Sequence, residues 1–252
     1  MTQAPSMVES FPSRVVHVVL VRQDDPALPA ALARWRPLLS ADELAREARF
    51  YFAADRERFA IGRALTRLQL SRFLGGDPRG WRFRVNGHGR PELDLPPGTA
   101  PPLGFNVSHT PGLVACAVTS TPDVGVDVEI VTRRLNHDIA DRFFAPREVA
   151  DLRALPVEQQ PHVFFDYWTL KEAYIKARGL GLALPLAHFA FRLRPPAAPT
   201  IGFDAEIDDD PSSWQFAQAW PDPDHRLGLA VRRGEGPDFD VRYEDGLAGP
   251  AA

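Results

Sequence analysis

The spacing of hydrophobic residues predicts a chain of mixed helices and strands. Between positions 124 and 130, Val or Ile fills every even position, while Gly125, Asp127 and Glu129 fill the odd ones. A period of two with β-branched residues predicts a strand. Positions 168–176 contain strong helix formers and neither Gly nor Pro, so a helix is predicted there.

Other segments extend this pattern over the rest of the chain. Asn86-Gly87 predicts a turn, and the long helix of the first half is expected to break near Ala53 and to stop at Gly75-Gly76. A helix followed by strands occurs once in each half, which suggests a pseudo-duplicated α+β chain with a boundary near Thr121. Further helices are expected near 40–74, 139–144, 147–155 and 163–178, and further strands near 14–22, 81–85, 105–107, 113–119, 188–193, 200–203, 214–219 and 227–232.

Composition is that of an ordinary globular protein. The 252 residues are 44% hydrophobic and 25% charged, enough for one large domain or two of ordinary size. The single cysteine, Cys116, excludes an intrachain disulfide and favours a reducing compartment. No basic region followed by an apolar run opens the chain, and no apolar stretch reaches about 18 residues, so neither a secretion signal nor a membrane span is expected.

Charge is distributed unevenly along the chain. Residues 1–125 carry 15 arginines and 12 acidic residues, whereas residues 126–252 carry 14 basic and 21 acidic residues. A weakly basic half followed by an acidic half suits a bound nucleotide, although random scatter of surface charge would give the same numbers. The excess of positive charge is too small for duplex DNA to be the main partner, so nucleic acid is not expected.

The lysines are concentrated in one helix. Of 29 basic residues only Lys171 and Lys176 are lysines, and both lie in the predicted helix. Positions three and four apart share a helix face, so an aromatic, a carboxylate and both amines are expected on one side. The alternative is a surface helix with a weak Glu172–Lys176 pair. The residues expected on this face are Trp168, Lys171, Glu172, Ile175 and Lys176.

Two carboxylates are expected side by side on the strand at 124–130. Asp127 and Glu129 are two positions apart, so their side chains point to the same face. Neighbouring carboxylates repel each other unless a cation lies between them, and Mg²⁺ prefers such hard oxygen ligands. The alternative is an exposed strand whose acidic face is solvated. Glu172 could supply a third carboxylate.

A third segment of interest is Phe105-Asn-Val-Ser-His109. Ser108 and His109 are expected at the end of a strand, where functional residues often lie. Adjacent strand side chains point to opposite faces, so the two do not form a nucleophile–base pair. Hydrogen bonds to an anionic ligand are the better role, and a turn with a locally bonded Ser and a packed His is the alternative.

These three segments, in this order, resemble the Sfp-type 4′-phosphopantetheinyl transferase family. The matching motifs are Phe105-Asn-Val-Ser-His109, Val124-Gly-Val-Asp-Val-Glu129 and Trp168-Thr-Leu-Lys-Glu-Ala-Tyr-Ile-Lys-Ala177. Gly89-Arg-Pro91 is similar to the Gly-Lys-Pro turn of the family. The resemblance extends from about Ser40 to about Leu193.

The resemblance implies the following site. Asp127, Glu129 and Glu172 would hold Mg²⁺ on the coenzyme A diphosphate, and Glu172 is also a candidate base for the incoming serine hydroxyl. Lys176 would contact the transferred or the leaving phosphate, while Lys171 and Trp168 would shape the site. The residues implied to contact coenzyme A are Arg46, Arg90, Asn106, Ser108, His109, Asp127 and Lys176, with Arg90 near the 3′-phosphate.

One position departs from the family pattern. Glu43 lies where some members have a further lysine, so a second phosphate contact in this helix is not expected. Ser40 and Glu43 instead form the sequence pattern of a capping box, which predicts that the helix begins here.

The resemblance also implies a fold and a reaction. Two pseudo-symmetric α+β subdomains would lie in one chain: residues 1–122 for nucleotide contacts, 123–245 with the metal site and the catalytic helix, and a flexible tail at 246–252. The protein would be a cytoplasmic monomer that transfers phosphopantetheine from coenzyme A to a serine of an apo acyl or peptidyl carrier protein and releases 3′,5′-ADP. The site would form between the two halves.

Two other functions use the same residues. A metal-dependent phosphohydrolase would use the three carboxylates with water as the nucleophile. A non-catalytic module that binds a carrier or a nucleotide would keep these residues as a vestigial metal site and catalyse no reaction. The nature of the carrier is not encoded in any of these motifs.

Overall fold

The computed structural model describes residues 13–96, 98–99, 102–131 and 137–248. Contacts divide the chain into two units, which are described separately. Unit 1 comprises residues 1–85, 91–122 and 240–252, and unit 2 comprises residues 86–90 and 123–239. The chain therefore crosses from unit 1 to unit 2 at Pro122–Asp123, near the expected boundary. It also crosses between the units after residues 85, 90 and 239, which the sequence did not suggest.

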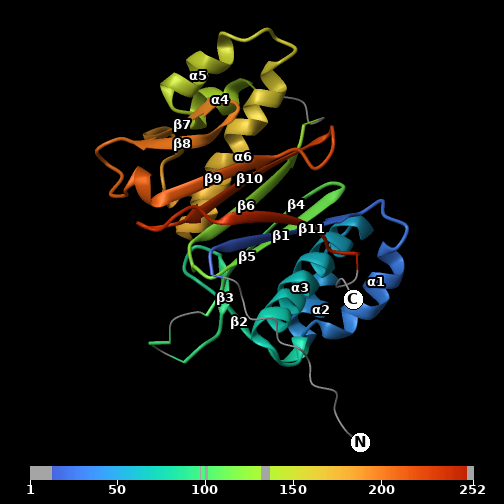
Figure 1. Cartoon of the computed structure of the whole chain (residues 1–252). Helices are drawn as coiled ribbons and strands as arrows, with labels where there is room; N and C mark the ends of the chain where they lie inside the picture. Colours follow the sequence, from blue (N-terminus) through green and yellow to red (C-terminus); the bar gives the residue numbers. More distant parts are fainter. Residues whose placement is uncertain (1–12, 97, 100–101, 132–136, 249–252) are drawn as a thin grey trace, which may run out of the picture. The chain divides into compact units, whose positions relative to one another are not determined.

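Unit 1 packs helices on a four-stranded sheet (Figure 1). The strand order is β11-β1-β5-β4, with β11 parallel to β1 and the other pairs antiparallel. Its core consists of apolar side chains from β1, β4, β5, α1 and α3. The elements of this unit are β1 (Val15–Arg22), α1 (Leu28–Trp35), α2 (Ala41–Glu47), α3 (Ala53–Leu74), β2 (Phe83–Val85), β3 (Pro91–Leu93), β4 (Gly104–Thr110), β5 (Leu113–Thr119) and β11 (Asp240–Asp245).

The start of α2 follows the predicted capping box. The Ser40 hydroxyl accepts the Glu43 N–H at 3.2 Å, and the Glu43 carboxylate accepts the Ser40 N–H at 2.9 Å. The predicted break between two helices lies between α2 and α3, and Gly75 ends α3 with a φ of 76°. Helix α1 and strands β3 and β11 were not expected from the sequence.

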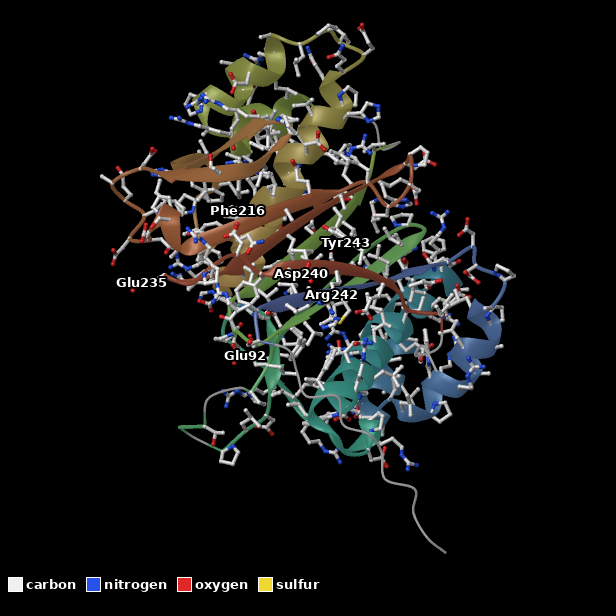
Figure 2. The ribbon with its side chains drawn as sticks, viewed as in Figure 1. Glu92, Phe216, Glu235, Asp240, Arg242 and Tyr243 are labelled. Carbon is white, nitrogen blue, oxygen red and sulfur yellow. The ribbon has the colours of Figure 1, made fainter. Side chains whose placement is uncertain are left out.

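Strand β11 brings the C-terminal segment back to unit 1. Asp240 lies opposite Val15, and Glu244 pairs with Arg72 of α3 at 2.6 Å. Figure 2 marks Asp240, Arg242 and Tyr243 on this strand. Beyond β11, the Gly246 N–H donates to the Leu20 carbonyl at 2.7 Å, within the segment expected to be a flexible tail.

Unit 2 packs one long helix on an antiparallel three-stranded sheet. The strand order is β6-β10-β9, and a separate β7–β8 hairpin adds to an aromatic-rich core. The elements of this unit are β6 (Val124–Ile130), α4 (His137–Phe143), α5 (Pro146–Arg153), α6 (Gln160–Arg178), β7 (Phe189–Arg194), β8 (Ala197–Phe203), β9 (Trp214–Ala219) and β10 (His225–Arg232). The predicted α+β class is confirmed, since each of the two units combines helices with a sheet.

Two glycines allow α6 to lie directly on the sheet. A Cβ atom at Gly125 of β6 would lie 2.0 Å from the Ala173 carbonyl oxygen of α6. One at Gly228 of β10 would lie 2.5 Å from the Thr169 carbonyl carbon. Because real Cβ contacts are never this short, any side chain at either position would displace the helix.

Gly125→Ala is therefore expected to destabilise the protein by about 3 kcal/mol, the upper part of the usual range for overpacking against backbone. Urea unfolding followed by circular dichroism measures this change. Gly202→Ala is the matched control, because a Cβ at this exposed position of β8 meets nothing within 4 Å. Equal stability of the two variants would contradict the close packing of α6.

Candidate functional site

Strand β6 presents its polar residues to α6. Gly125, Asp127 and Glu129 share one face, and the contact of Gly125 with Ala173 shows that α6 covers this face. Asp127 is only 4% exposed, while Glu129 is half-buried. The strand and the shared face of the two carboxylates agree with the alternation of residues 124–130.

Helix α6 brings Lys176 and Glu172 to the Asp127 carboxylate. The Lys176 Nζ atom donates to Asp127 Oδ1 at 2.6 Å and to the Val126 carbonyl at 3.2 Å. Burial raises the pKa of Glu172, and the nearby Asp127 carboxylate raises this pKa further, while Lys176 opposes both effects. Two acids and one amine therefore form a coupled group at the carboxylate face of β6.

The chemistry of this group fits a divalent cation. Mutual repulsion of the Asp127 and Glu172 carboxylates is relieved by a positive charge between them, and carboxylate oxygens are the ligands that Mg²⁺ prefers. Glu129 follows on the same strand face. Asp127, Glu129 and Glu172 would hold the metal.

A second group of possible metal ligands lies elsewhere in unit 2. Among the described residues, His188, Asp204 and Glu206 place one ligand atom each within 4.8 Å of the others. Asp204 and Glu206 are exposed, and none of the three residues was predicted to bind metal. Exposed acidic groups commonly exist without a bound ion.

Lys171 lies apart from Lys176, so the predicted shared face of the two lysines is wrong. The Lys171 side chain is 0% exposed, and its Nζ atom pairs with Glu148 Oε2 at 2.8 Å. It also donates to the carbonyls of Leu186 at 2.8 Å and Phe189 at 2.6 Å. The two lysines are five positions apart, which on a helix is a rotation of about 140°. Full burial leaves the Lys171 amine inaccessible to a ligand.

The partner of Lys171 is equally buried. Glu148 of α5 also accepts the N–H groups of Ala145 at 2.9 Å and Phe191 at 2.7 Å. Burial raises the pKa of Glu148 and lowers the pKa of Lys171, and their attraction opposes both shifts. The pair therefore joins α5, α6 and β7 inside unit 2.

Trp168 is placed among aromatic rings. It stacks on Phe164 with ring centres 5.9 Å apart and meets Phe143 edge-on at 6.1 Å. The indole is half-buried, and it packs against the core of unit 2. Its predicted contribution to the shape of the site stays a prediction.

In unit 1, three predicted ligand contacts line one cavity of about 200 Å³. Arg46, Asn106 and His109 contribute to its wall, and so do Arg58 and Arg63 of α3, which the sequence analysis missed. On an arginine-rich helix, these two residues look like ordinary solvated side chains. The cavity nevertheless collects three arginines and a histidine, so its wall suits an anion.

Phe59 holds two of the arginines at the cavity wall. The guanidinium carbons of Arg46 and Arg63 lie 5.5 and 5.4 Å from the centre of its ring. Burial lowers the pKa of Arg63, the Glu43 carboxylate raises it, and the neighbouring positive charge of Arg46 lowers it again. Like charges held this close favour a bound anion.

Ser108 does not line this cavity. Asn106 and His109 of β4 belong to the cavity wall, whereas the side chain of Ser108 is buried. The predicted contact of Ser108 with an anionic ligand stays a prediction.

Glu43 has a structural role. Besides capping α2, its Oε2 atom accepts two hydrogen bonds from Arg67, at 3.0 Å from Nε and 2.8 Å from Nη2. Arg67 is 1% exposed and also donates to the carbonyls of Pro78 and Trp81. Glu43 therefore caps a helix and neutralises a buried arginine.

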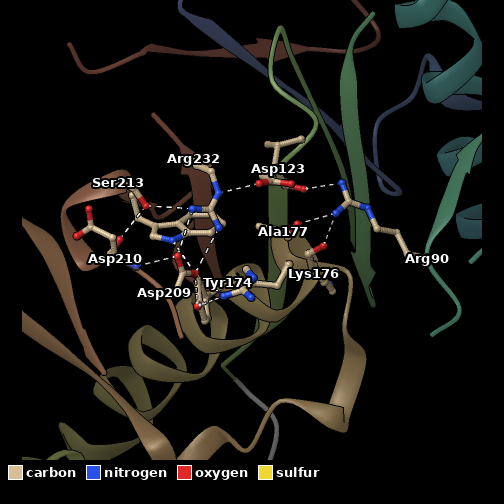
Figure 3. Close-up of polar contacts among 12 residues, drawn as sticks. Arg90, Asp123, Tyr174, Lys176, Ala177, Asp209, Asp210, Ser213 and Arg232 are labelled. Atoms are coloured by element: carbon tan, nitrogen blue, oxygen red, sulfur yellow. Dashed lines mark hydrogen bonds and ion pairs between the residues drawn. The ribbon is translucent and has the colours of Figure 1, made fainter. Parts of the chain in front are cut away.

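Arg90 binds the backbone of α6. Its guanidinium donates to the carbonyls of Lys176, Ala177 and Val124 at 2.9, 2.6 and 3.3 Å (Figure 3). The predicted contact of Arg90 with the 3′-phosphate region stays a prediction.

Comparisons with known proteins identify the family. The family model of the 4′-phosphopantetheinyl transferase superfamily matches residues 123–230, and a model described as 4′-phosphopantetheinyl transferase, N-terminal, matches residues 28–121. The 4′-phosphopantetheinyl transferase HetI of Nostoc sp. is 38% identical over 206 residues, covering 81% of this chain and 80% of that protein. The chain belongs to the 4′-phosphopantetheinyl transferase superfamily.

Other transferases of this superfamily align over most of the chain. The 4′-phosphopantetheinyl transferase Sfp of Bacillus subtilis is 31% identical, with coverage of 89% of this chain and 97% of that protein. Another 4′-phosphopantetheinyl transferase of Bacillus subtilis is 37% identical over 69% of this chain and 75% of that protein.

Each family model matches mainly one of the two units. The N-terminal model covers most of the helices and strands of unit 1, and the superfamily model begins at Asp123 and contains β6 and α6. Within the described part of this transferase, no helix is both long enough and apolar enough to cross a membrane.

Lys171→Met is expected to cost this transferase about 3–5 kcal/mol, because it leaves Glu148 buried without its partner. The double variant Lys171→Met/Glu148→Gln is expected to recover part of that loss, since no buried charge remains. Urea unfolding gives the stability of each variant. A Lys171→Met protein with unchanged stability and no activity would contradict the structural role and support a catalytic one.

Proposed function

We propose that this superfamily member transfers the 4′-phosphopantetheine group from coenzyme A to a serine of an apo acyl or peptidyl carrier protein. The reaction would depend on Mg²⁺ and would release 3′,5′-ADP. The holo carrier would then serve fatty acid, polyketide or nonribosomal peptide synthesis. The observation that carries the proposal is the coupled group of Asp127, Glu172 and Lys176 in a chain of this family.

The reaction is phosphoryl transfer, which needs positioning and charge stabilisation more than covalent help. Asp127, Glu129 and Glu172 would hold Mg²⁺, which when bound neutralises charge on the diphosphate. Lys176 supplies a compact point charge, and its half-buried ammonium can approach a phosphate oxygen.

Glu172 is the candidate base for the serine hydroxyl of the carrier. A general base works best when its pKa lies near the working pH. Burial and the Asp127 carboxylate raise the pKa of Glu172 in that direction. The serine proton would pass to the Glu172 carboxylate as the serine oxygen attacks the phosphorus of the pantetheine-bearing phosphate, and the phosphoanhydride bond to the leaving 3′,5′-ADP would break.

The cavity of unit 1 would take a phosphate of coenzyme A. Arg46, Arg58, Arg63 and His109 offer charge-assisted hydrogen bonds there, and Asn106 offers an amide. Ser108 and Arg90, which the family resemblance also placed near the nucleotide, lie outside the wall of this cavity.

Location and assembly are further parts of the proposal. We expect a cytoplasmic monomer, because both halves of the predicted site lie in one chain and a single cysteine forms no disulfide within it. Neither nucleic acid nor a membrane is an expected partner. Light scattering of the purified protein would measure the assembly state.

The transfer is tested by the intact mass of an apo carrier protein incubated with this protein, coenzyme A and Mg²⁺. The carrier should gain one phosphopantetheine, and a carrier whose acceptor serine is replaced by alanine should gain none. Glu172→Gln should lower the rate by about 10²–10⁴-fold while the protein stays folded, and EDTA should stop the reaction. Hydrolysis of coenzyme A without carrier modification would favour a phosphohydrolase, and binding alone would favour a non-catalytic module.

Arg58→Ala should raise the KM for coenzyme A about tenfold or more, because the cavity loses one charged donor to a phosphate. Steady-state kinetics with saturating carrier measures the change. Arg34→Ala, at a basic residue of α1 outside this cavity, is the control and should leave KM unchanged. An unchanged KM in Arg58→Ala would remove this cavity from the nucleotide site.

A further inference from the structure

The turn between β2 and β3 is a rigid element that belongs to unit 2. The Asn86 side-chain oxygen accepts the N–H groups of His88 at 2.9 Å and Arg90 at 3.0 Å. The Asn86 N–H donates to the Arg90 carbonyl at 2.9 Å, and Gly89 adopts a φ of 90°. Residues 86–90 are therefore held in one conformation by their own hydrogen bonds.

Both ends of this turn bind the last turn of α6. The Arg90 Nη1 atom donates to the carbonyls of Lys176 and Ala177, and the Asn86 side-chain nitrogen donates to the Gly179 carbonyl at 3.2 Å. The last carbonyls of a helix lack partners within the helix, and positive charge is favourable at this end. A Cβ at Gly179 would lie 3.2 Å from Arg90 Cδ, so the turn packs closely against the helix end.

A second contact holds α6 just before that turn. Asp209 lies in the loop after β8, and its side chain is 3% exposed. Its carboxylate accepts the Tyr174 hydroxyl at 2.7 Å and also binds Arg178, so two residues of α6 meet one acid (Figure 3). Arg232 of β10 donates to the same carboxylate at 3.2 Å. The end of α6 is thus fixed from two separate segments of unit 2.

Lys176 is the residue that these contacts affect most directly. Its backbone carbonyl accepts a hydrogen bond from Arg90, while its side-chain ammonium donates to the Asp127 carboxylate of β6. A small rotation of the last helical turn would move the ammonium away from the carboxylate.

We propose that Arg90 is a positioning residue that fixes the last turn of α6 and thereby the Lys176 ammonium, and that it does not hold the nucleotide. The proposal rests on the transferase function proposed above. A positioning role of Arg90 can be distinguished experimentally from a direct contact of Arg90 with the 3′-phosphate. A residue that contacts the 3′-phosphate matters only when the substrate has this group, whereas a residue that positions Lys176 matters for any substrate.

The experiment compares Arg90→Ala with the wild type, using coenzyme A and dephospho-coenzyme A, which lacks the 3′-phosphate. Arg90→Ala should lower kcat about 10–100-fold with both substrates and leave the KM for coenzyme A nearly unchanged. Arg90→Lys should recover part of kcat, because an ammonium can still donate to at least one helix carbonyl. Arg84→Ala, an exposed arginine of the same hairpin, is the matched control and should behave like the wild type.

One further variant separates positioning from a general loss of stability. Ile201→Val, in the core of unit 2, gives a variant with a lowered melting temperature but an intact helix end. At a temperature where every variant is folded by circular dichroism, Ile201→Val should retain full kcat.

The outcomes decide between the roles. A defect of Arg90→Ala that appears with coenzyme A and vanishes with dephospho-coenzyme A would overturn the proposal in favour of a direct nucleotide contact. A kcat equal to that of the wild type would overturn it too, because the helix end would then need no Arg90. Failure of the wild type to modify any carrier would instead overturn the transferase function.

Discussion

The close approach of α6 to its sheet is the constraint on which the site of unit 2 depends. Two positions without a side chain, Gly125 and Gly228, face the helix backbone at Ala173 and Thr169. At this separation, an ammonium on the helix reaches a carboxylate on β6 directly. If side chains at the two glycine positions held α6 further from the sheet, Lys176 could not reach Asp127 directly, and a longer side chain or a bridging ion would be needed. The glycines therefore set the scale of the site, and the acids and the lysine supply its charge.

Charged residues serve two different purposes in this fold. Lys171 with Glu148 and Arg67 with Glu43 are buried pairs that join separate segments. Lys176 pairs with Asp127 and keeps part of its side chain exposed. The two lysines of α6 therefore differ in burial: Lys171 is enclosed in the core of unit 2, and Lys176, the lysine of the proposed site, is accessible to solvent.

Much of the fold followed from local patterns, and the exceptions have physical reasons. The alternation at 124–130 and the capping box at Ser40 depend on neighbours in the sequence, so both could be predicted. Strand β11 is rich in charged residues and pairs in parallel with β1, far away in the sequence, so no local signal marks it. In the proposed site, the pattern and the family resemblance named Asp127 and Lys176, and the structure brings these two side chains together. The burial of Lys171 depends on Glu148, which no spacing within α6 could reveal.

The pairing of β11 with β1 also has a consequence for the order in which the protein acquires its structure. During synthesis, β1 leaves the ribosome near the beginning, while its neighbour β11 is made only after all the strands and helices of unit 2. Until then, one side of β1 presents unpaired backbone groups, which is a hazard for a strand composed mainly of valines. The first unit to emerge is thus the last to be finished, and its maturation must wait for the whole of the second unit to be translated.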